Sequence, residues 1–527
     1  MSLSDKINEL TIEQKIILQT GKDILRTAKI AEIPQAMMVD GPHGLRLCEN
    51  GKTTPQVAFP SLSTIANSWN REAVWKMGEA IARQCQKQTV ALLLAPGVNI
   101  KRHVLCGRNF EYFSEDPFLA GELGAAYVMG VQSTGIGACV KHFAANNQES
   151  GRLATNSVID EKALREIYLA PFERVIKKAK PWAVMCSYNA VNGEYSSQNK
   201  KLLTDILRKE WDYEGLTISD WWSVDDRIES IKAGLDLEMP RGETRKLLNA
   251  VKENKLAEAE LDTCCRHILD FLEKADKITQ TKIDPDGQKK VAAEVAAESV
   301  VLLKNDGILP FTDDHIVVVG SYADTCRIGG KGSSEVKPLQ KDSVIKQLKS
   351  AGKSFEYYPG YIINSEKTNR RYESEAINNS KGKTVLFFMA DPDLSEAESY
   401  DRENMSLPLC QLRLLNKLSL VAKNIVVVLQ CGAPVDCAWS KMANAILLQG
   451  LAGEYGSEGL TKILYGELSP SGKLAETWPL TIGSQASDSD FAQKKRNVFY
   501  KESIYVGYRY FDSARIRIAF PFGFGLS

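Results

Sequence analysis

The chain has 527 residues, and its 66 basic and 66 acidic side chains give no formal net charge at neutral pH. Nucleic-acid-binding proteins usually carry a clustered surplus of Lys and Arg, which this sequence lacks, so we expect no nucleic-acid partner. No window approaches the roughly 18 consecutive apolar residues of a membrane-spanning helix, and we expect no membrane association. A hydrophobic content of 44% excludes a disordered chain, and the length exceeds that of one ordinary domain.

The N-terminus and the cysteines favour a cytoplasmic protein without a metal centre. The first ten residues predict a capped amphipathic helix rather than a signal peptide. The 11 cysteines are scattered singly apart from Cys264-Cys265, they form no CxxC pair, and only 5 histidines accompany them. We therefore expect reduced thiols, and we predict neither a metal ion nor a cofactor.

From about residue 33 to residue 240, short apolar runs alternate with amphipathic helical stretches, which is typical of parallel βαβ units. The runs that predict strands are residues 36–39, 90–94, 136–140, 182–185, 216–218 and 235–239. Charged and hydrogen-bonding residues directly follow several of these runs, as Lys141-His142 and Ser219-Asp220 do. Because the carboxyl ends of the strands of a (β/α)8 barrel converge on the face where active sites lie, we predict a barrel, with a doubly wound sheet as the alternative.

The rest of the chain predicts a connecting region and a second α/β domain. Residues 241–300 have a helical, connecting pattern with a break at residues 284–287. The β-branched runs 315–319, 384–388, 425–429 and 445–448 predict the buried strands of a mostly parallel sheet. The predicted order is a barrel over 1–280, a linker over 281–300, an α/β sandwich domain over 301–490 and a C-terminal tail over 491–527 that packs on both domains.

Charged residues near the predicted strand ends suit a neutral, polyhydroxylated ligand. These residues are Asp40, Arg46, Arg108, Lys141, His142 and Asp220. Acidic groups backed by cationic and hydrogen-bonding groups bind the hydroxyls of a sugar, whose ring packs on an aromatic face. Trp221 and Trp222 directly follow Asp220, and they are either this face or an aromatic pair of the core.

Glycoside cleavage requires one carboxylate and one carboxylic acid that flank the scissile bond. Asp220, among cationic and hydrogen-bonding groups, is the natural ionised partner. The residues by themselves leave the acid open among Glu111, Glu149, Glu238, Glu335, Glu396 and Glu398. Other chemistries lack their motifs, because there is no GxSxG elbow and the glycine-rich stretch 329–334 matches neither a dinucleotide nor a Walker loop.

Several motifs, in a shared order, resemble glycoside hydrolase family 3, the β-glucosidase and β-xylosidase group. They are VDGPHGLR (39–46), GRNFE (107–111), KHFAANN (141–147), MCSYN (185–189), SDW (219–221), GSS (332–334), DR (401–402) and PSGKL (470–474). The resemblance covers nearly the whole chain and implies a retaining hydrolase of β-linked terminal sugars. Many members continue after the motif at 522–527 into a fibronectin-like third domain, and we expect this chain to lack it.

The resemblance also implies roles for individual residues. Asp220 matches the catalytic nucleophile, and Trp221 matches an aromatic side chain beside the bound sugar. The residues that match those holding the terminal sugar are Asp40, Arg46, Arg108, Lys141, His142 and Tyr188. The acid/base Glu is expected in the stretch 395–402, where Glu398 fits best and Glu396 is the alternative, and Ser333 is expected to contact that Glu.

We therefore expect an exo-acting β-glucosidase with small carbohydrate substrates. β-Xylosidase or α-L-arabinofuranosidase activity is the nearest alternative, because it depends on whether the pocket accommodates a C6 hydroxymethyl group. A non-hydrolytic sugar-binding protein on the same scaffold is a further alternative, against which the presence of Asp220, Lys141 and His142 argues. The sequence leaves open whether the chain forms a homo-oligomer.

Overall fold

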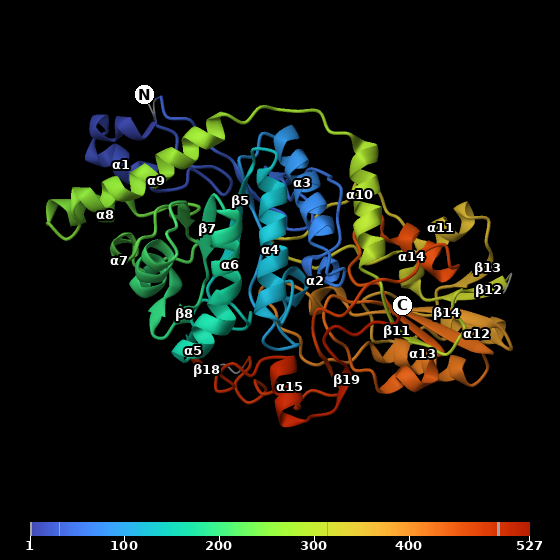
Figure 1. Ribbon diagram of the computed structural model, residues 1–527. Helices are drawn as coiled ribbons and strands as arrows, with labels where there is room; N and C mark the ends of the chain where they lie inside the picture. The colour runs from blue at the N-terminus through green and yellow to red at the C-terminus, as the bar shows by residue number, and fades with distance from the viewer. Residues whose placement is uncertain (1–2, 31, 313–314, 493–495) are drawn as a thin grey trace.

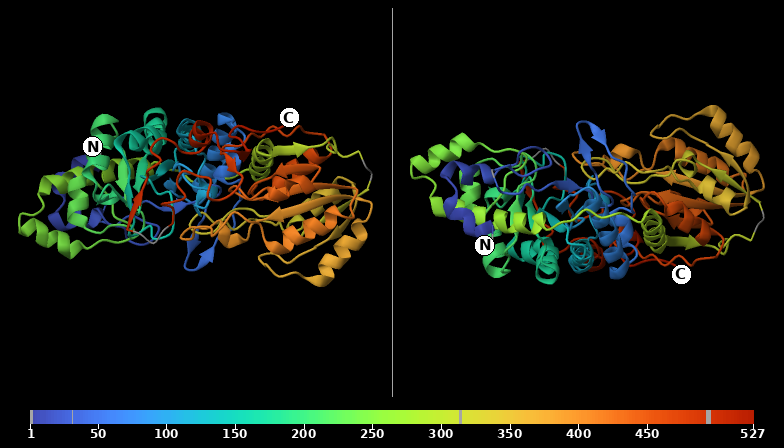
Figure 2. Two further views of the ribbon diagram at one scale, coloured as in Figure 1. Left: turned by 90° about the horizontal axis from the view of Figure 1, so that it is seen from below. Right: turned by 90° about the horizontal axis from the view of Figure 1, so that it is seen from above.

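The computed structural model describes residues 3–30, 32–312, 315–492 and 496–527. The N-terminal half (blue to green in Figure 1) and the C-terminal half (yellow to orange) lie at opposite ends of an elongated molecule, as both views of Figure 2 show. The predicted N-terminal helix forms as a 3-10 helix, Leu3–Glu9, followed by α1, Ile12–Leu18; residues 1–2 of that prediction lie outside the described residues. Within the described ranges, no helix has the length and apolar character needed to cross a membrane.

The first half is built on a parallel sheet. Backbone pairing continues from its last strand back to its first, so the sheet forms a ring. Its five strands, in spatial order, are β1 (Met38–Asp40), β4 (Leu92–Leu94), β5 (Gly137–Phe143), β7 (Ala183–Cys186) and β10 (Leu216–Ile218). Beyond β10, single bridges link Ile218 to Leu237 and Glu238 to Thr20. A turn over residues 20–27 then pairs antiparallel with Met37, next to β1. The predicted barrel is thus confirmed as the fold class, and an antiparallel turn, not a further βα unit, closes one side of its ring.

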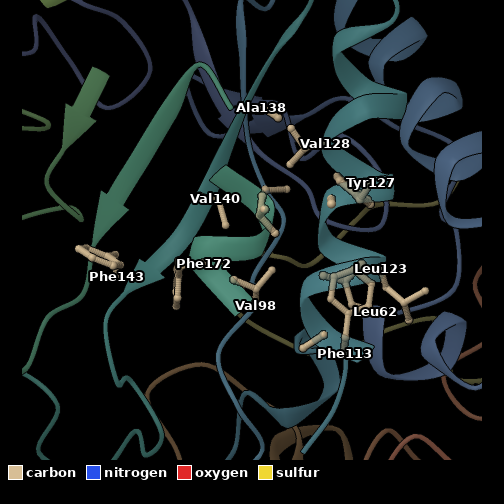
Figure 3. Close-up of a cluster of buried hydrophobic side chains, with 14 of the residues drawn as sticks. Leu62, Val98, Phe113, Leu123, Tyr127, Val128, Ala138, Val140, Phe143 and Phe172 are labelled. Atoms are coloured by element: carbon tan, nitrogen blue, oxygen red, sulfur yellow. The ribbon is translucent and has the colours of Figure 1, made fainter. Parts of the chain in front are cut away.

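Helices cover this sheet, and apolar side chains fill the space between them. In Figure 3, Ala138 of β5 lies against Val128 of α4, and Phe143 packs edge-on against Phe172 of α6 with ring centroids 5.2 Å apart. Complete burial of one such side chain stabilises the fold by about 1.5–3 kcal/mol, so the strand ends rest on a rigid core. The covering helices include α2 (Leu62–Ala66), α3 (Arg71–Lys87), α4 (Pro117–Gln132), α5 (Glu161–Ala163), α6 (Ala170–Ala179), α7 (Arg227–Ala233), α8 (Thr244–Lys252) and α9 (Glu258–Asp276), with π-type turns over Leu164–Leu169 and Lys201–Glu210.

The second half is a six-stranded sheet with helices on both faces (Figure 1). Its spatial order is β11 (Val301–Asn305), β16 (Ala445–Leu448), β15 (Asn424–Gln430), β14 (Thr384–Ala390), β12 (His315–Val319) and β13 (Ser354–Tyr358). All pairs are parallel except β11 with β16, which confirms the predicted mostly parallel sheet. Its helices are α11 (Val344–Ser350), α12 (Arg370–Ser380), α13 (Leu409–Ser419) and α14 (Gly456–Leu464).

The sequence did not predict two of these strands, β11 and β13. Both are at the edges of the sheet, where one neighbour is missing and a continuous apolar run is not required. In β13, the sequence Ser-Phe-Glu-Tyr-Tyr is only half-buried, and β11 ends in Lys304 and Asn305. Strand β13 therefore lacks the β-branched pattern that marks the four central strands, whereas β11 begins with the buried apolar run Val301-Leu302-Leu303 and departs from that pattern only at its polar end.

The segment between the halves and the tail both connect the two domains. The break predicted at 284–287 begins helix α10 (Pro285–Glu298), because the side chain of Asp284 caps its N-terminus. Buried Ala292 and Val295 of α10 join the core of the first half, while the same helix packs on α14 of the second. In the tail, β18 (Asn497–Phe499) adds to a small sheet of the first half that contains β6 (Asn156–Val158), β8 (Ala190–Val191) and β9 (Glu194–Tyr195). Helix α15 spans Tyr508–Ala514. Strand β19 (Ile518–Phe520) pairs with β17 (Trp478–Pro479) of the second half.

Candidate active site

A cavity of about 490 Å³ opens at the carboxyl ends of β1, β5, β7 and β10. Every residue that the sequence analysis placed in the site lines this cavity: Asp40, Arg46, Arg108, Lys141, His142, Tyr188, Asp220, Trp221, Ser333 and Glu398. The first eight come from the barrel domain, and the last two come from loops of the second domain. The site therefore forms only where the two domains meet.

Asp220 lies two residues beyond β10, in a short loop at the cavity wall. Its Oδ1 accepts a hydrogen bond from the backbone N of Trp221 at 2.7 Å, and its Oδ2 is 3.7 Å from Nε2 of His142. Burial raises the pKa of Asp220 to about 6, although the positive charge of Arg108 opposes that rise. This carboxyl group is thus ionised above a pH of about 6.

Fixed charges of the barrel surround Asp220. Nζ of Lys141 donates to Oδ1 of Asp40 at 2.8 Å, at the end of β1. Arg108 is fully buried and donates through Nε to Glu111, whereas its Nη1 has no hydrogen-bond partner in the described part of the chain. Burial lowers the pKa of His142 well below its usual value, so the imidazole is neutral. These groups offer an acceptor and several donors to the hydroxyls of a neutral ligand.

Glu398 reaches the cavity on the loop that follows β14. Its Oε2 accepts a hydrogen bond from the backbone N of Ser333 at 2.7 Å, and its Oε1 is 2.9 Å from Nη2 of Arg152. Burial would raise the pKa of Glu398, but Arg108 and Arg152 outweigh burial and hold that pKa well below its usual range. Glu398 is therefore an ionised carboxylate at neutral pH.

The other glutamates that the sequence left open do not line the cavity. Glu396 is buried in the second domain, where it pairs with Arg327 and accepts a hydrogen bond from the backbone N of Gly432. Glu111 pairs with Arg108, and Glu149 contacts Arg152. Glu238 and Glu335 also lie outside the lining. Of these candidates, Glu398 is the one whose carboxylate borders the space that Asp220 borders.

Several residues of the site were not found from the sequence. Arg152, on the loop after β5, lies over the ring of Tyr188 at 4.2 Å from the ring centroid and bridges Glu149 and Glu398. Its position ten residues after His142, in a polar loop that follows a predicted strand, was the signal that could have found it. The apolar mouth of the cavity is formed by Ile24 and Leu153, which the sequence did not indicate, and by Trp222, which the sequence placed either at an aromatic face for the sugar or in the core. Ile24 belongs to the ring-closing turn, which carries no strand pattern in the sequence.

Trp222 has an unusual conformation beside Asp220. Its φ of 59° is in the left-handed region, which costs a bulky residue about 1–3 kcal/mol. Its side chain is also 71% exposed, so burial does not compensate that cost. Neither local backbone preference nor core packing explains the conformation and exposure of Trp222. Its place at the cavity mouth indicates that it contacts a ligand.

Both halves of the chain match models of one known protein family. The model of the glycosyl hydrolase family 3 N-terminal domain matches residues 7–271, and that of the C-terminal domain of the same family matches residues 300–527. Among curated proteins, the thermostable beta-glucosidase B of Acetivibrio thermocellus is 42% identical over 99% of this chain and 72% of its own length. An exo-alpha-(1->6)-L-arabinopyranosidase of Bifidobacterium longum is 40% identical over 99% of this chain and 72% of its own length.

Solved structures agree with this comparison. The GH3 beta-glucosidase of Bifidobacterium adolescentis matches with a TM-score of 0.95 and 41% identity, over 99% of this chain and 78% of its own. Beta-glucosidase 3B of Thermotoga neapolitana, in complex with glucose, matches with a TM-score of 0.91 and 34% identity, over 100% of this chain and 83% of its own.

Proposed function

The chain belongs to glycosyl hydrolase family 3 and is a glycoside hydrolase, and we propose that it is a retaining, exo-acting β-glucosidase that releases terminal β-D-glucose. One observation carries the proposal. Asp220 of the barrel domain and Glu398 of the second domain border one cavity among groups suited to sugar hydroxyls. The names of the relatives, beta-glucosidases among them, support glucose as the sugar.

The proposed reaction is a double displacement with the two carboxyl groups in different roles. The Asp220 carboxylate attacks the anomeric carbon while protonated Glu398 gives its proton to the departing glycosidic oxygen. Glu398, then ionised, takes a proton from a water molecule, which attacks the anomeric carbon and releases Asp220. The attacking and departing groups thus come from different domains, so their separation depends on how the domains pack.

The pKa values of the two carboxyl groups are in the opposite order from the one that the first step needs. Asp220 has the raised pKa, of about 6, and Glu398 has the lowered one. Glu398 takes up a proton more readily when its contact with Arg152 weakens, because loss of a nearby positive charge raises a carboxyl pKa. Weaker contacts of Glu398 with Arg108 and Arg152 would therefore favour the first step.

The depth of the cavity supports an exo-acting enzyme. Arg108, Lys141 and His142, which face the inner part, are each no more than 2% exposed. Leu153 and Trp222, at the mouth, are 59% and 71% exposed. One terminal sugar is thus enclosed by polar groups, whereas the leaving group lies against apolar side chains near solvent.

A panel of 4-nitrophenyl glycosides tests the proposal. It contains the β-D-glucoside, β-D-xyloside, β-D-galactoside and N-acetyl-β-D-glucosaminide, together with the α-L-arabinofuranoside and the α-L-arabinopyranoside. We expect the highest kcat/KM on the β-D-glucoside. The arabinopyranoside is included because two of the relatives are named for that activity. Release from none of them would favour a non-hydrolytic sugar-binding protein and contradict the proposal.

We also propose a cytoplasmic location. All 11 cysteines lie in the described part of the chain, where none forms a disulfide and nine are buried. Free thiols in this number suit a reducing compartment. Fractionation of the native host, with the enzyme followed by its β-glucosidase activity, tests this location.

Size-exclusion chromatography with light scattering measures the oligomeric state, which the sequence leaves open.

A further inference from the structure

The loop that carries Glu398 is held by a second set of interdomain contacts, centred on Asp401. One carboxylate oxygen of Asp401 accepts hydrogen bonds from the backbone N atoms of Gly107 at 3.1 Å and Glu149 at 3.0 Å. The other accepts from the backbone N of Ser150 at 2.7 Å. A single side chain of the second domain thus binds two separate loops of the barrel domain.

Glu149 makes the reciprocal contact. Its backbone N donates to Asp401, while its side-chain Oε2 accepts from the backbone N of Ser399 at 2.7 Å and from Nη1 of Arg152 at 2.7 Å. Ser399 directly follows Glu398 and has a φ of 74°, a left-handed conformation that an L-residue keeps only when its surroundings impose it. The side chain of Glu149 is completely buried. The chain is therefore fixed both one and three residues after Glu398.

The loop lies on the barrel without free space. A Cβ atom at Gly107 would lie 1.6 Å from the carbonyl O of Tyr400 and 2.6 Å from that of Ala397. On the N-terminal side, the backbone N of Glu398 donates to the carbonyl O of Lys331 at 3.0 Å. The backbone around Glu398 is thus anchored from both domains, and its side chain has little freedom to move away from the cavity.

We propose that Asp401 and Glu149 are positioning residues that place the acid/base carboxyl of Glu398 opposite Asp220; this inference rests on the proposed function. Both residues lie outside the cavity lining, so they act on the reaction through Glu398 and Arg152. Because geometry governs proton transfer, a shift of the Glu398 carboxyl by about 1 Å costs on the order of 100-fold in rate. Asp401 and Glu149 thus couple the packing of the two domains to protonation of the leaving group.

An interdomain ion pair that is not part of the loop of Glu398 provides a matched control. Buried Lys101 of the barrel domain pairs with Glu476 of the second domain at 2.7 Å. Substitution of Glu476 weakens the interface at a similar depth but leaves the loop of Glu398 in place. A purely structural role of Asp401 would make D401N and E476Q alike in their effects.

The test measures kcat/KM of the wild type, D401N, D401A and E476Q on aryl β-glucosides whose leaving groups range from 2,4-dinitrophenol to phenol. Departure of dinitrophenolate needs no proton, whereas departure of phenolate relies on the acid. We expect D401A to lose about 100-fold on the phenyl glucoside and less than about threefold on the dinitrophenyl glucoside. D401N, which keeps one acceptor oxygen, should lose less, and E476Q should lose equally on both.

The outcomes separate the two proposals. An equal loss by D401N across all leaving groups overturns the positioning role, even if D401A does not fold. Hydrolysis of none of these β-glucosides by the wild type overturns the proposed function and, with it, this inference. E149Q provides a second reading, because its amide oxygen still accepts from Ser399 while its ion pair with Arg152 is lost. E149Q should lose more kcat/KM on the phenyl glucoside than on the dinitrophenyl glucoside, and an equal loss on both substrates would contradict the role of Glu149.

Discussion

The two carboxyl groups of the site are held in place by different means. Asp220 follows a regular strand whose neighbour is fixed in register, with Ile218 opposite Met185 and a buried core beneath both. Glu398 is on an irregular loop that depends on a few hydrogen bonds to another domain, made by Ser399 and Asp401. Many small packing contacts thus hold Asp220 in place, whereas a few individual hydrogen bonds hold Glu398. Substitutions away from the cavity should therefore disturb acid catalysis far more easily than nucleophilic attack.

The largest effect is expected for Asp220→Ala, which removes the proposed nucleophile. Loss of a nucleophile typically lowers kcat by about 10⁴-fold or more. The measurement is kcat on 4-nitrophenyl β-D-glucoside, with circular dichroism to verify folding. Asp225→Ala is the control, because Asp225 is an exposed carboxylate five residues away that does not line the cavity. Retention of more than about 1% of the activity by Asp220→Ala would show that another group attacks.

Next in size is Glu398→Ala, whose loss should depend on the leaving group. We expect kcat/KM on a natural disaccharide to fall by about 10²–10⁴-fold, the usual contribution of a general acid. Azide should restore part of the turnover of an activated aryl glucoside, with β-glucosyl azide as the product. Full activity of Glu398→Ala on the disaccharide would contradict the assignment.

Glu396→Gln sharpens this comparison, because Glu396 is two residues away but buried against Arg327. Removal of one partner of a buried ion pair costs about 3–5 kcal/mol of stability. We therefore expect a lower unfolding temperature with no rescue by azide. Rescue of this variant by azide would transfer the acid/base role to Glu396.

A medium effect is expected for Arg152→Gln, which removes a positive charge near both carboxyl groups. Arg152 lowers the pKa of Glu398 and that of Asp220, so its removal should raise both. The limb of the kcat/KM profile near pH 6, where Asp220 titrates in the wild type, should therefore move to higher pH by about one unit. Arg174→Gln, whose Arg pairs with Glu122 on the outer helices, is the control. A profile that stays in place would disprove the electrostatic role of Arg152.

The smallest effect is expected for Trp222→Gly at the cavity mouth. Glycine adopts a positive φ without strain, so the unfolding temperature should stay the same or rise slightly. The KM for aryl β-glucosides should increase about threefold, because an exposed aromatic contact to the leaving group is lost. Leu420→Gly on the far surface of the second domain, 79% exposed, is the control for the loss of an exposed apolar side chain. An unchanged KM would show that Trp222 does not contact the leaving group.

The same contrast explains what the sequence predicted well. Apolar runs located five strands of the barrel sheet and the four central strands of the second sheet, because buried strands need continuous hydrophobic residues. Polar residues at the ends of those strands, such as Lys141 and Asp220, follow from the same pattern. They lie where predicted because the strand fixes their direction.

Features held by irregular backbone were harder to predict. The choice between Glu396 and Glu398 depends on a loop without periodicity, and only the pairing of Glu396 with Arg327 separates the two in space. The turn that closes the ring at residues 20–27 uses single bridges, for which the sequence has no repeating signal. Arg152 is recognisable as a site residue only once its contacts with Tyr188 and Glu398 are known.

The most direct test of the account identifies the residue that becomes bonded to the sugar. 2,4-Dinitrophenyl 2-deoxy-2-fluoro-β-D-glucoside slows release of the glycosyl enzyme more than its formation, since the fluorine destabilises both transition states while the good leaving group favours the first step. Proteolysis and mass spectrometry of the inactivated enzyme then locate the fluoroglucosyl group. The account predicts an ester on Asp220, within a peptide that contains Ser219-Asp220-Trp221. Labelling of Glu398 or of any other residue, or turnover without a covalent intermediate, would contradict it.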